Sequence, residues 1–198
     1  MTEQTIRSFI AIELPEEVKK VLKRIRTEMA LDKYGFIKAV APEGIHLTLK
    51  FLGNVPEPKL ADIVKVMEQS SQGVAPFPLQ ITEVGAFPDM RRPRVIWVGI
   101  KGELDKLIGW QQRLDKGLVP LGFPKEERPF TPHLTLARVR ENCSPADRLR
   151  FGEMVAGTHV EIDYKFTVTG LNLMRSQLRP TGAVYSCLAE IKLVGTGF

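Results

Sequence analysis

Two of the three histidines in this chain lie in the same four-residue motif, His-Leu-Thr-Leu. The first motif joins His46 to Thr48, and the second joins His133 to Thr135. Both motifs alternate polar and apolar residues, as a half-buried β-strand does, and side chains two positions apart in a strand share one face. We therefore predict that each histidine projects together with its threonine, while the leucines point into a core.

Two histidines and two hydroxyls suit a displacement at phosphorus. The unperturbed pKa of imidazole is about 6.5, so one histidine can take a proton from water while the other donates a proton to the leaving oxygen. Thr48 and Thr135 can donate hydrogen bonds to the non-bridging oxygens, whose negative charge grows in the transition state. A purely structural role would leave the repeated polar pairs unexplained, because unpaired polar groups are costly to bury.

Other catalytic chemistries lack their residues in this sequence. A zinc site needs at least three protein ligands, and no His, Cys, Asp or Glu cluster supplies the third. The sequence also lacks the G-x-S-x-G nucleophile elbow, the P-loop and the dinucleotide-binding glycine pattern. We expect neither a metal nor a cofactor. The third histidine, His159, is expected to be an ordinary surface residue.

The predicted elements that carry the motifs occur in the same order, at nearly the same spacing, in both halves of the chain. In the first half, strand, helix, motif strand and helix are expected at 6–12, 16–29, 45–51 (ending before Gly53-Asn54) and 58–68. In the second half, they are expected at 95–100, 104–114, 131–138 and 145–155, with a Gly/Pro-rich loop at 118–130.

This repetition predicts an internal duplication inside one bilobal domain spanning 1–198. The first repeat should cover about 5–70 and the second about 94–157, with the remaining strands at about 78–84, 160–175 and 183–193. Alternating stretches of this kind are typical of antiparallel strands with one buried face. The expected fold is α+β. It has two pseudo-twofold-related lobes, each an antiparallel-rich sheet with helices on its outer face, and an active-site cleft between them.

With these motifs and their flanks, the sequence resembles the two-histidine phosphoesterase superfamily and, within it, the RNA 2′,3′-cyclic phosphodiesterases, also called 2′-5′ RNA ligases. The resemblance covers essentially the full length. The flanking segments that carry it are Arg7-Ser8-Phe9-Ile10-Ala11-Ile12, Lys50-Phe51-Leu52-Gly53, Arg94-Val95-Ile96-Trp97 and Phe130-Thr131-Pro132. It implies hydrolysis of a 2′,3′-cyclic phosphate at an RNA end to a 2′-phosphomonoester, and the joining of RNA ends through a 2′-5′ bond.

On the family pattern, His46 is the proton donor to O3′ and His133 is the proton acceptor that activates water. Because the two motifs are nearly symmetric, the sequence leaves an exchange of these roles open. Two alternatives also stay open. One is a phosphodiesterase for small cyclic nucleotides or 2′-5′ oligoadenylate, and the other is a module that binds RNA or a nucleotide without turnover.

Several arginines near the motifs could bind phosphate. Arg138 follows His133 by five residues and would lie on the leucine face of a regular strand, so a bulge or the strand end is needed to bring it to the site. Arg128, before the second motif, and Arg94, beside the Trp97 strand, are further candidates together with Arg91 and Arg92. RNA binding through such residues would weaken with salt.

Four aromatic residues are candidates for stacking on bases. Phe130, at the entrance to the second motif strand, is expected at the rim of the cleft. Phe51 is expected on the leucine face, opposite His46, and therefore outside the site. Trp97 and Tyr185 are more typical of core positions.

Composition limits the class of protein. The 198 residues carry a formal charge of +5, which favours a polyanionic partner. No apolar run is long enough for a membrane span, and the N-terminus lacks the pattern of a secretory signal. The two cysteines, Cys143 and Cys187, are expected to be reduced and structural. We expect a cytoplasmic monomer without an obligate protein partner or membrane contact, acting on RNA ends such as tRNA fragments.

Overall fold

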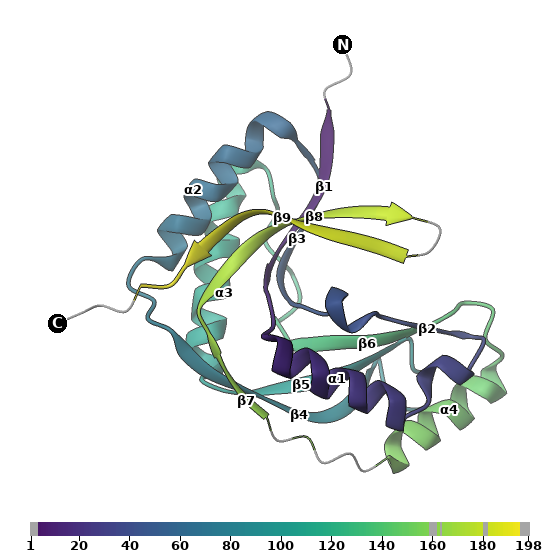
Figure 1. Cartoon of the computed structure of the whole chain (residues 1–198). Helices are drawn as coiled ribbons and strands as arrows, with labels where there is room; N and C mark the ends of the chain where they lie inside the picture. Colours follow the sequence, from purple (N-terminus) through teal and green to yellow (C-terminus); the bar gives the residue numbers. More distant parts are fainter. Residues whose placement is uncertain (1–3, 159–161, 163, 180–181, 195–198) are drawn as a thin grey trace.

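The computed structural model describes residues 4–158, 162, 164–179 and 182–194. In this part of the chain, two antiparallel sheets and four α-helices form an α+β fold (Figure 1). One sheet has the strand order β3-β1-β8-β9: Leu47–Pro56, Thr5–Ile12, Gly170–Arg179 and Gly182–Lys192. The other has the order β2-β6-β5-β4-β7: Ile37–Ala39, His133–Val139, Val95–Gly102, Phe77–Phe87 and Tyr164–Val168.

The helices connect the two sheets crosswise. α2 (Leu60–Ser71) and α3 (Leu104–Leu118) pack together and contact β9 and β3 of the four-stranded sheet, whereas α1 (Glu16–Glu28) and α4 (Pro145–Gly157) contact β7 and β4 of the five-stranded sheet (Figure 1). Thus α1 follows a strand of one sheet but packs on the other, and α3 does the reverse. Each lobe therefore contains segments from both halves of the chain.

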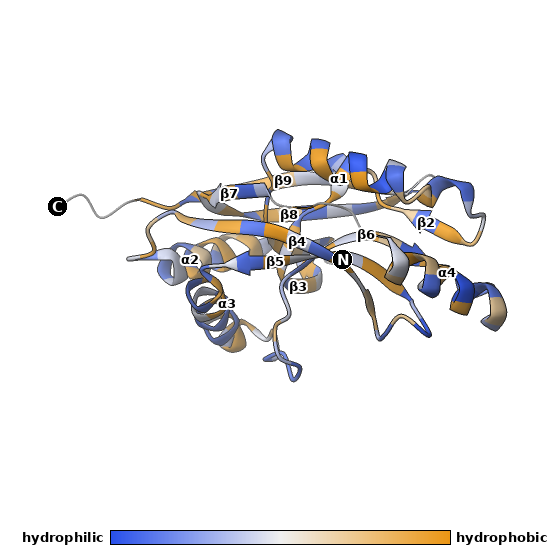
Figure 2. Cartoon of the chain, turned by 90° about the horizontal axis from the view of Figure 1, so that it is seen from below, coloured by the Kyte–Doolittle hydropathy of each residue, from blue (hydrophilic) through white to orange (hydrophobic). Residues whose placement is uncertain are grey.

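Local sequence explains where the helices form. In α1, Val18, Leu22 and Ile25 are buried at helical spacing, and Figure 2 shows polar and apolar residues alternating around its turns. Two acidic residues occupy its first turn, where they interact favourably with the helix dipole. At the start of α4, the Ser144 hydroxyl accepts a hydrogen bond from the backbone N–H of Asp147, an N-cap that satisfies a free helix-end donor.

The predicted architecture is confirmed, including the two lobes and all four helices. The two sheets share the strand pattern β3-β1-β8-β9 and β6-β5-β4-β7, and β2 is added beside β6. In each sheet, the motif strand pairs with the first strand of its own half of the chain: β3 with β1, and β6 with β5. This order agrees with an internal duplication, whose boundaries remain a prediction.

Three details differ from the prediction. β3 does not end at Gly53-Asn54 but pairs with β1 as far as Pro56, because Gly53 adopts φ +71° at an irregularity inside the strand. The stretch at 160–175, where remaining strands were predicted, contains β7 and the first part of β8, which belong to different sheets. Residues 159–161, including His159, and residue 163 lie outside the described residues. The short strand β2 was not predicted.

Both cysteines are free. Cys143 is buried, as a structural cysteine should be, but Cys187 is exposed on β9. Among the residues that the structure describes, no helix is long and apolar enough to cross a bilayer.

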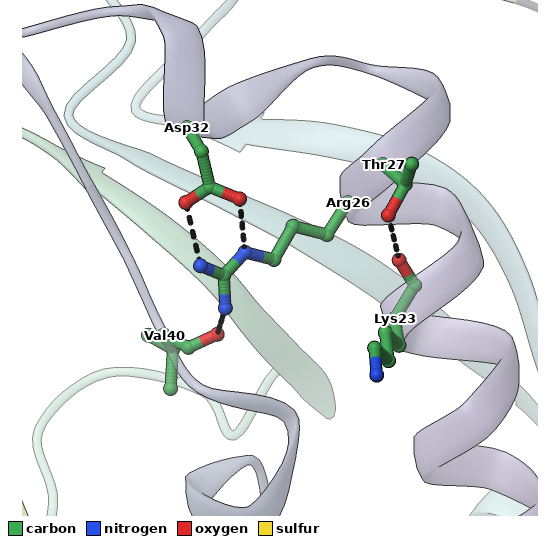
Figure 3. A network of polar contacts seen from close by, with 5 residues as sticks. All are labelled: Lys23, Arg26, Thr27, Asp32 and Val40. Atoms are coloured by element: carbon green, nitrogen blue, oxygen red, sulfur yellow. Dashed lines mark hydrogen bonds and ion pairs between the residues drawn. The ribbon is translucent and has the colours of Figure 1, made fainter.

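Two short 3₁₀ helices and a polar network shape the segment before the first motif, and two more follow it. η1 (Leu31–Lys33) follows α1, η2 (Pro42–Gly44) precedes His46, and η3 (Glu57–Lys59) follows β3, while a fourth, η4 (Val119–Leu121), follows α3. Arg26 donates to both carboxylate oxygens of Asp32 and to the carbonyl of Val40 (Figure 3). The guanidinium lowers the pKa of Asp32 through these hydrogen bonds. Arg26 therefore ties the end of α1 to the chain that leads to His46.

The core makes a stability prediction. Trp110 on α3 is 1% exposed, and its indole N–H donates to the Ser71 hydroxyl. We expect Trp110→Ala to lower the free energy of unfolding by about 3–5 kcal/mol through the cavity that it leaves. Val119→Ala, at an exposed position, should change it by less than about 0.5 kcal/mol. Urea unfolding of both variants measures the difference, and equal losses would contradict the packing described here.

Candidate active site

The two His–Thr pairs lie on the sheet faces turned away from the main core. His46 directly precedes β3, and His133 opens β6. Their leucine neighbours are all in the main buried cluster, whereas both histidines and both threonines are partly exposed. β3 and β6 contact each other, although they belong to different sheets. The predicted sharing of a face by each histidine with its threonine agrees with this burial pattern.

Each motif strand contains one extra residue at the same place. In β3, Lys50 pairs with Ile10 and Thr48 with Ala11, so Leu49 has no partner in β1. In β6, Ala137 pairs with Ile96 and Thr135 with Trp97, so Leu136 has none in β5. Both extra residues come three positions after the motif histidine. Such a β-bulge shifts the alternation of the side chains that follow it.

The bulge in β6 carries Arg138 to the site face. Arg138 pairs with Val95, which shares a face with Trp97 and therefore with Thr135. The bulge that Arg138 needed in order to leave the leucine face is thus present. Lys38 of β2 lies directly opposite Arg138 and is a second cation on this face. It was missed because a three-residue strand gives no clear periodic signal.

The bulge in β3 corrects the prediction for Phe51. Phe51 pairs with Phe9, and Phe9 shares a face with Ala11 and Thr48. Its ring centroid is 6.2 Å from that of Phe9, and 63% of Phe51 is exposed. Phe51 was expected opposite His46, but the extra Leu49 returns it to the histidine face. It is therefore available as a stacking surface beside the site.

Aromatic rings enclose His46. Phe9 stacks on its imidazole at 4.5 Å with an interplanar angle of 26°, and Tyr185 meets it edge-on at 5.1 Å. A Cβ at Gly44 would lie 3.3 Å from the Tyr185 ring, so glycine allows this close approach. Burial lowers the pKa of His46 from its ordinary value of 6.5 to about 4, and a hydrogen bond with the backbone of Gly44 opposes the shift.

His133, which is also partly exposed, is oriented by a backbone carbonyl. Its Nδ1 lies 2.8 Å from the carbonyl oxygen of Thr131, and Phe87 meets the ring edge-on at 5.0 Å. A carbonyl accepts only, so Nδ1 carries the proton and donates it to this bond, which leaves Nε2 as the free acceptor of a neutral ring. His46 interacts with the residue two positions earlier in the same way. Each imidazole thus presents one nitrogen for chemistry.

The threonine hydroxyls are free to bind a ligand. Thr48 lies opposite Ala11, and Thr135 lies opposite Trp97. Among the described residues, neither hydroxyl has a hydrogen-bond partner in the protein, and both side chains are partly exposed. Two free donors next to two imidazoles fit a bound oxyanion.

The remaining predicted residues lie in three different surroundings. Arg128 is exposed and lines a hollow of about 630 Å³ between β3 and the loop at 123–128. Neither histidine lines that hollow, although Phe51 does. Phe130 is half-buried and packs against the main core, and its place at the rim of the cleft stays a prediction. Arg94 is exposed just before β5, and its backbone bonds to Phe87 and Val139.

The structure shows the surroundings of two further aromatic candidates, Trp97 and Tyr185. Trp97 lies flat over Gly85, where a Cβ would come within 2.2 Å of the indole, and its ring centroid is 5.2 Å from that of Phe87. Tyr185 belongs to the small cluster of Phe9, Ala11 and Met174, not to the main core. Phe9 and Phe87, which contact the histidines, were missed, although Phe9 alternates with the core residues of the first predicted strand. In the described part of the chain, no three His, Cys, Asp or Glu residues are grouped as metal ligands.

The fold and the paired motifs define a two-histidine phosphoesterase, and comparison with known proteins gives the family. A family model described as "LigT like Phosphoesterase" matches this chain twice, at residues 12–97 and 98–185. The chain belongs to this family. The two matches together span both motifs and both halves of the chain.

Full-length relatives support this assignment. A Methanothermobacter thermautotrophicus protein named RNA 2′,3′-cyclic phosphodiesterase is 34% identical over 95% of this chain and 99% of its own length. An Archaeoglobus fulgidus protein with the same name is 35% identical over 92% and 98%. A Thermus thermophilus crystal structure matches with a TM-score of 0.79 and 30% identity, covering 97% of this chain and all of its own. Escherichia coli LigT with 3′-AMP, at 24% identity and a TM-score of 0.73, covers 96% of this chain and 98% of its own and shows the fold alone.

The buried His46 should make stability depend on pH. The unfolded chain binds a proton at this residue below about pH 6.5 and the folded chain only below about pH 4, so the unfolded state holds more protons between these values. Stability contributed by neutral His46 is complete above pH 6.5 and falls by up to about 3 kcal/mol as the pH drops to 4. We expect this part of the acid loss to disappear in His46→Gln. Urea unfolding at pH 7.5, 5.5 and 4 measures the difference, and parallel curves for the two proteins would contradict it.

Proposed function

We propose that this chain hydrolyses the 2′,3′-cyclic phosphate at the 3′ end of RNA to a 2′-phosphomonoester by acid–base catalysis with His46 and His133. The observation that carries the proposal is the pair of equivalent motif strands, each presenting an imidazole and a free threonine hydroxyl on one face. Membership in the phosphoesterase family and the names of the full-length relatives support the substrate.

In the proposed reaction, the cyclic phosphate lies between the two motifs. The hydroxyls of Thr48 and Thr135 donate to its non-bridging oxygens. Nε2 of His133 takes a proton from a water molecule as the water oxygen attacks phosphorus, and the Thr131 carbonyl holds the ring in the required tautomer. The P–O3′ bond breaks, and O3′ receives a proton from His46. The product is a 2′-phosphate with a free 3′-hydroxyl.

The proton donor must be charged before it acts. With a pKa of about 4 in the empty site, His46 is almost entirely neutral at pH 7. A bound phosphodiester brings a negative charge to its imidazole, which favours the protonated form and raises the pKa. The low pKa of the free enzyme favours instead the second assignment, in which His46 is the base and His133 the acid. The two assignments differ in which histidine donates a proton to the leaving oxygen, O3′.

Replacing each histidine by alanine should lower kcat by about 10²–10⁴-fold, and a sulfur analogue separates the roles. In a cyclic substrate with sulfur in place of O3′, the leaving thiolate is a much weaker base than an alkoxide and needs little protonation. We expect His46→Ala to lose far less activity on this substrate, while His133→Ala stays impaired. The assay follows the 2′-phosphate product by chromatography with EDTA present, and Thr167→Val on β7 is the exposed control.

If His133→Ala kept activity on the sulfur substrate while His46→Ala stayed impaired, His133 would be the proton donor. Wild-type protein that binds the RNA end but forms no product would favour the binding module and contradict the proposed hydrolysis. Activity confined to mononucleotides or 2′-5′ oligoadenylate would change the substrate but not the mechanism.

Arg138 and Lys38 are proposed to bind the RNA backbone next to the scissile phosphate. Both are exposed, and both lie on the His133 face. A cation that neutralises one phosphate contributes about one to the slope of log affinity against log salt. We expect Arg138→Gln to weaken binding of a non-hydrolysed RNA end and to reduce this slope by about one. Arg150→Gln, at an exposed position on α4, should change neither, and an unchanged slope in Arg138→Gln would contradict the assignment.

A second reaction, the RNA substrates, the compartment and the oligomeric state are also proposed. In the joining of RNA ends through a 2′-5′ bond, a 5′-hydroxyl would replace water as the nucleophile and the P–O3′ bond would again break, so the two histidines would keep their roles. They would exchange roles in the reverse cleavage of the 2′-5′ bond. The joining would be detected in the same assay from RNA with a 5′-hydroxyl and a cyclic phosphate. RNA cleavage fragments such as tRNA halves are the proposed substrates, and the two free cysteines suit a reducing cytoplasm. The proposed active form is a monomer, since each chain carries both motifs.

A further inference from the structure

Lys50 is a buried cation that the chemistry above does not use. It follows the extra residue Leu49 in β3, pairs with the core residue Ile10, and is only 3% exposed. Its Nζ lies 2.6 Å from the carboxylate of Asp115 on α3 and 3.1 Å from that of Glu126. It also donates a hydrogen bond of 2.6 Å to the carbonyl of Pro124.

The partners of Lys50 come from α3 and from the loop that leads to His133. Asp115 accepts a hydrogen bond from the backbone N–H of Glu126, so it holds the loop as well as the lysine. One turn earlier on α3, the side chain of Gln111 donates to the carbonyl of Leu49. Both residues of the β3 bulge are thus held by α3, and the loop is attached at the same point.

Stability alone does not explain a lysine here. A buried ion pair costs much of its attraction in desolvation, and an apolar pair of similar volume is often as stable or more so. The other motif strand provides an internal comparison. Ala137 occupies the equivalent place after the bulge in β6, pairs with Ile96 and is fully buried. A bulge of this kind therefore forms with a small apolar residue, and the charge in β3 serves another purpose.

We propose that Lys50 is a positioning residue that couples the two motifs, an inference that rests on the proposed function. By fixing Pro124 and Glu126 to β3, it holds the loop that ends at Thr131, whose carbonyl orients the imidazole of His133. Through Lys50, β3 of the first motif thereby fixes the position of the His133 imidazole. A loose loop would misplace the acid–base group without removing it, and small misplacements of a catalytic group lower the rate steeply.

The test separates positioning from folding. Lys50→Met alone leaves the buried carboxylate of Asp115 without its cation, with only the backbone N–H of Glu126 as a partner, and should destabilise the protein. The double variant Lys50→Met with Asp115→Leu replaces the pair by apolar groups and should recover much of that stability. We expect this double variant to keep KM within about threefold while kcat falls about tenfold or more. Lys59→Met is the matched control, because Lys59 also donates to a carbonyl of this region, Leu121, but from the surface.

A second variant tests the proposal with little loss of stability, and a second measurement tests it without turnover. Glu126→Ala removes one partner from the half-exposed side and should lower kcat about threefold with little loss of stability. Imidazole nitrogen NMR of His133 should show the Nδ1–H form losing dominance in the double variant but not in Lys59→Met. This readout does not need turnover, so it tests the positioning even if wild-type protein fails to hydrolyse RNA. A stable double variant with wild-type kcat, or with an unchanged His133 spectrum, would overturn the proposal.

Discussion

The extra residue in each motif strand is the constraint on which the site depends. In a regular strand, the fifth residue after each histidine would point into the core, and both Phe51 and Arg138 would be lost from the site face. The bulge leaves two successive residues on the buried side, and their carbonyls need partners. The other half of the chain supplies them: Gln111 of α3 donates to Leu49, and the backbone N–H of Val40 donates to Leu136. Val40 is held in turn by Arg26 of α1. Each half of the molecule therefore stabilises the irregular strand of the other.

The two half-sites are equivalent in backbone but not in environment. Phe9 and Tyr185 remove water from around His46, and its pKa falls because the charged ring loses hydration. His133 instead has Phe87 edge-on to its ring and its Nδ1 held by the carbonyl of Thr131. A duplicated scaffold thus holds two imidazoles in different surroundings, and a reaction with one proton donor and one acceptor needs such a difference. The negative charge of a bound phosphodiester would favour the protonated form of His46.

Sequence reasoning recovered what is local and periodic. The strands around both motifs, the four helices and the shared face of each His–Thr pair follow from alternation or from apolar residues at helical spacing. It failed where the pattern is broken or where partners are distant. Phe51 was assigned to the wrong face because a bulge adds a residue without changing the sequence pattern. The alternation was read over 160–168 and strands were expected over 160–175, but the pattern gave no sign that the chain changes sheets between β7 and β8. Nothing local indicates that Lys50 meets Asp115, which lies on a helix from the second half.

The crosswise helices explain why these distant contacts matter. Because α1 packs on the five-stranded sheet and α3 on the four-stranded sheet, neither lobe can complete its core from its own half. A chain built in this way should fold as one cooperative unit, since separating the lobes would expose apolar surface on both. The same arrangement limits relative motion of the two motifs. α3, which follows a strand of the five-stranded sheet, contacts β3, and Val40, which bonds to Leu136 of β6, is held by Arg26 of α1. Catalysis by two groups from different sheets needs this rigidity. The packing of α1 and α3 on the sheets opposite to the strands they follow provides it.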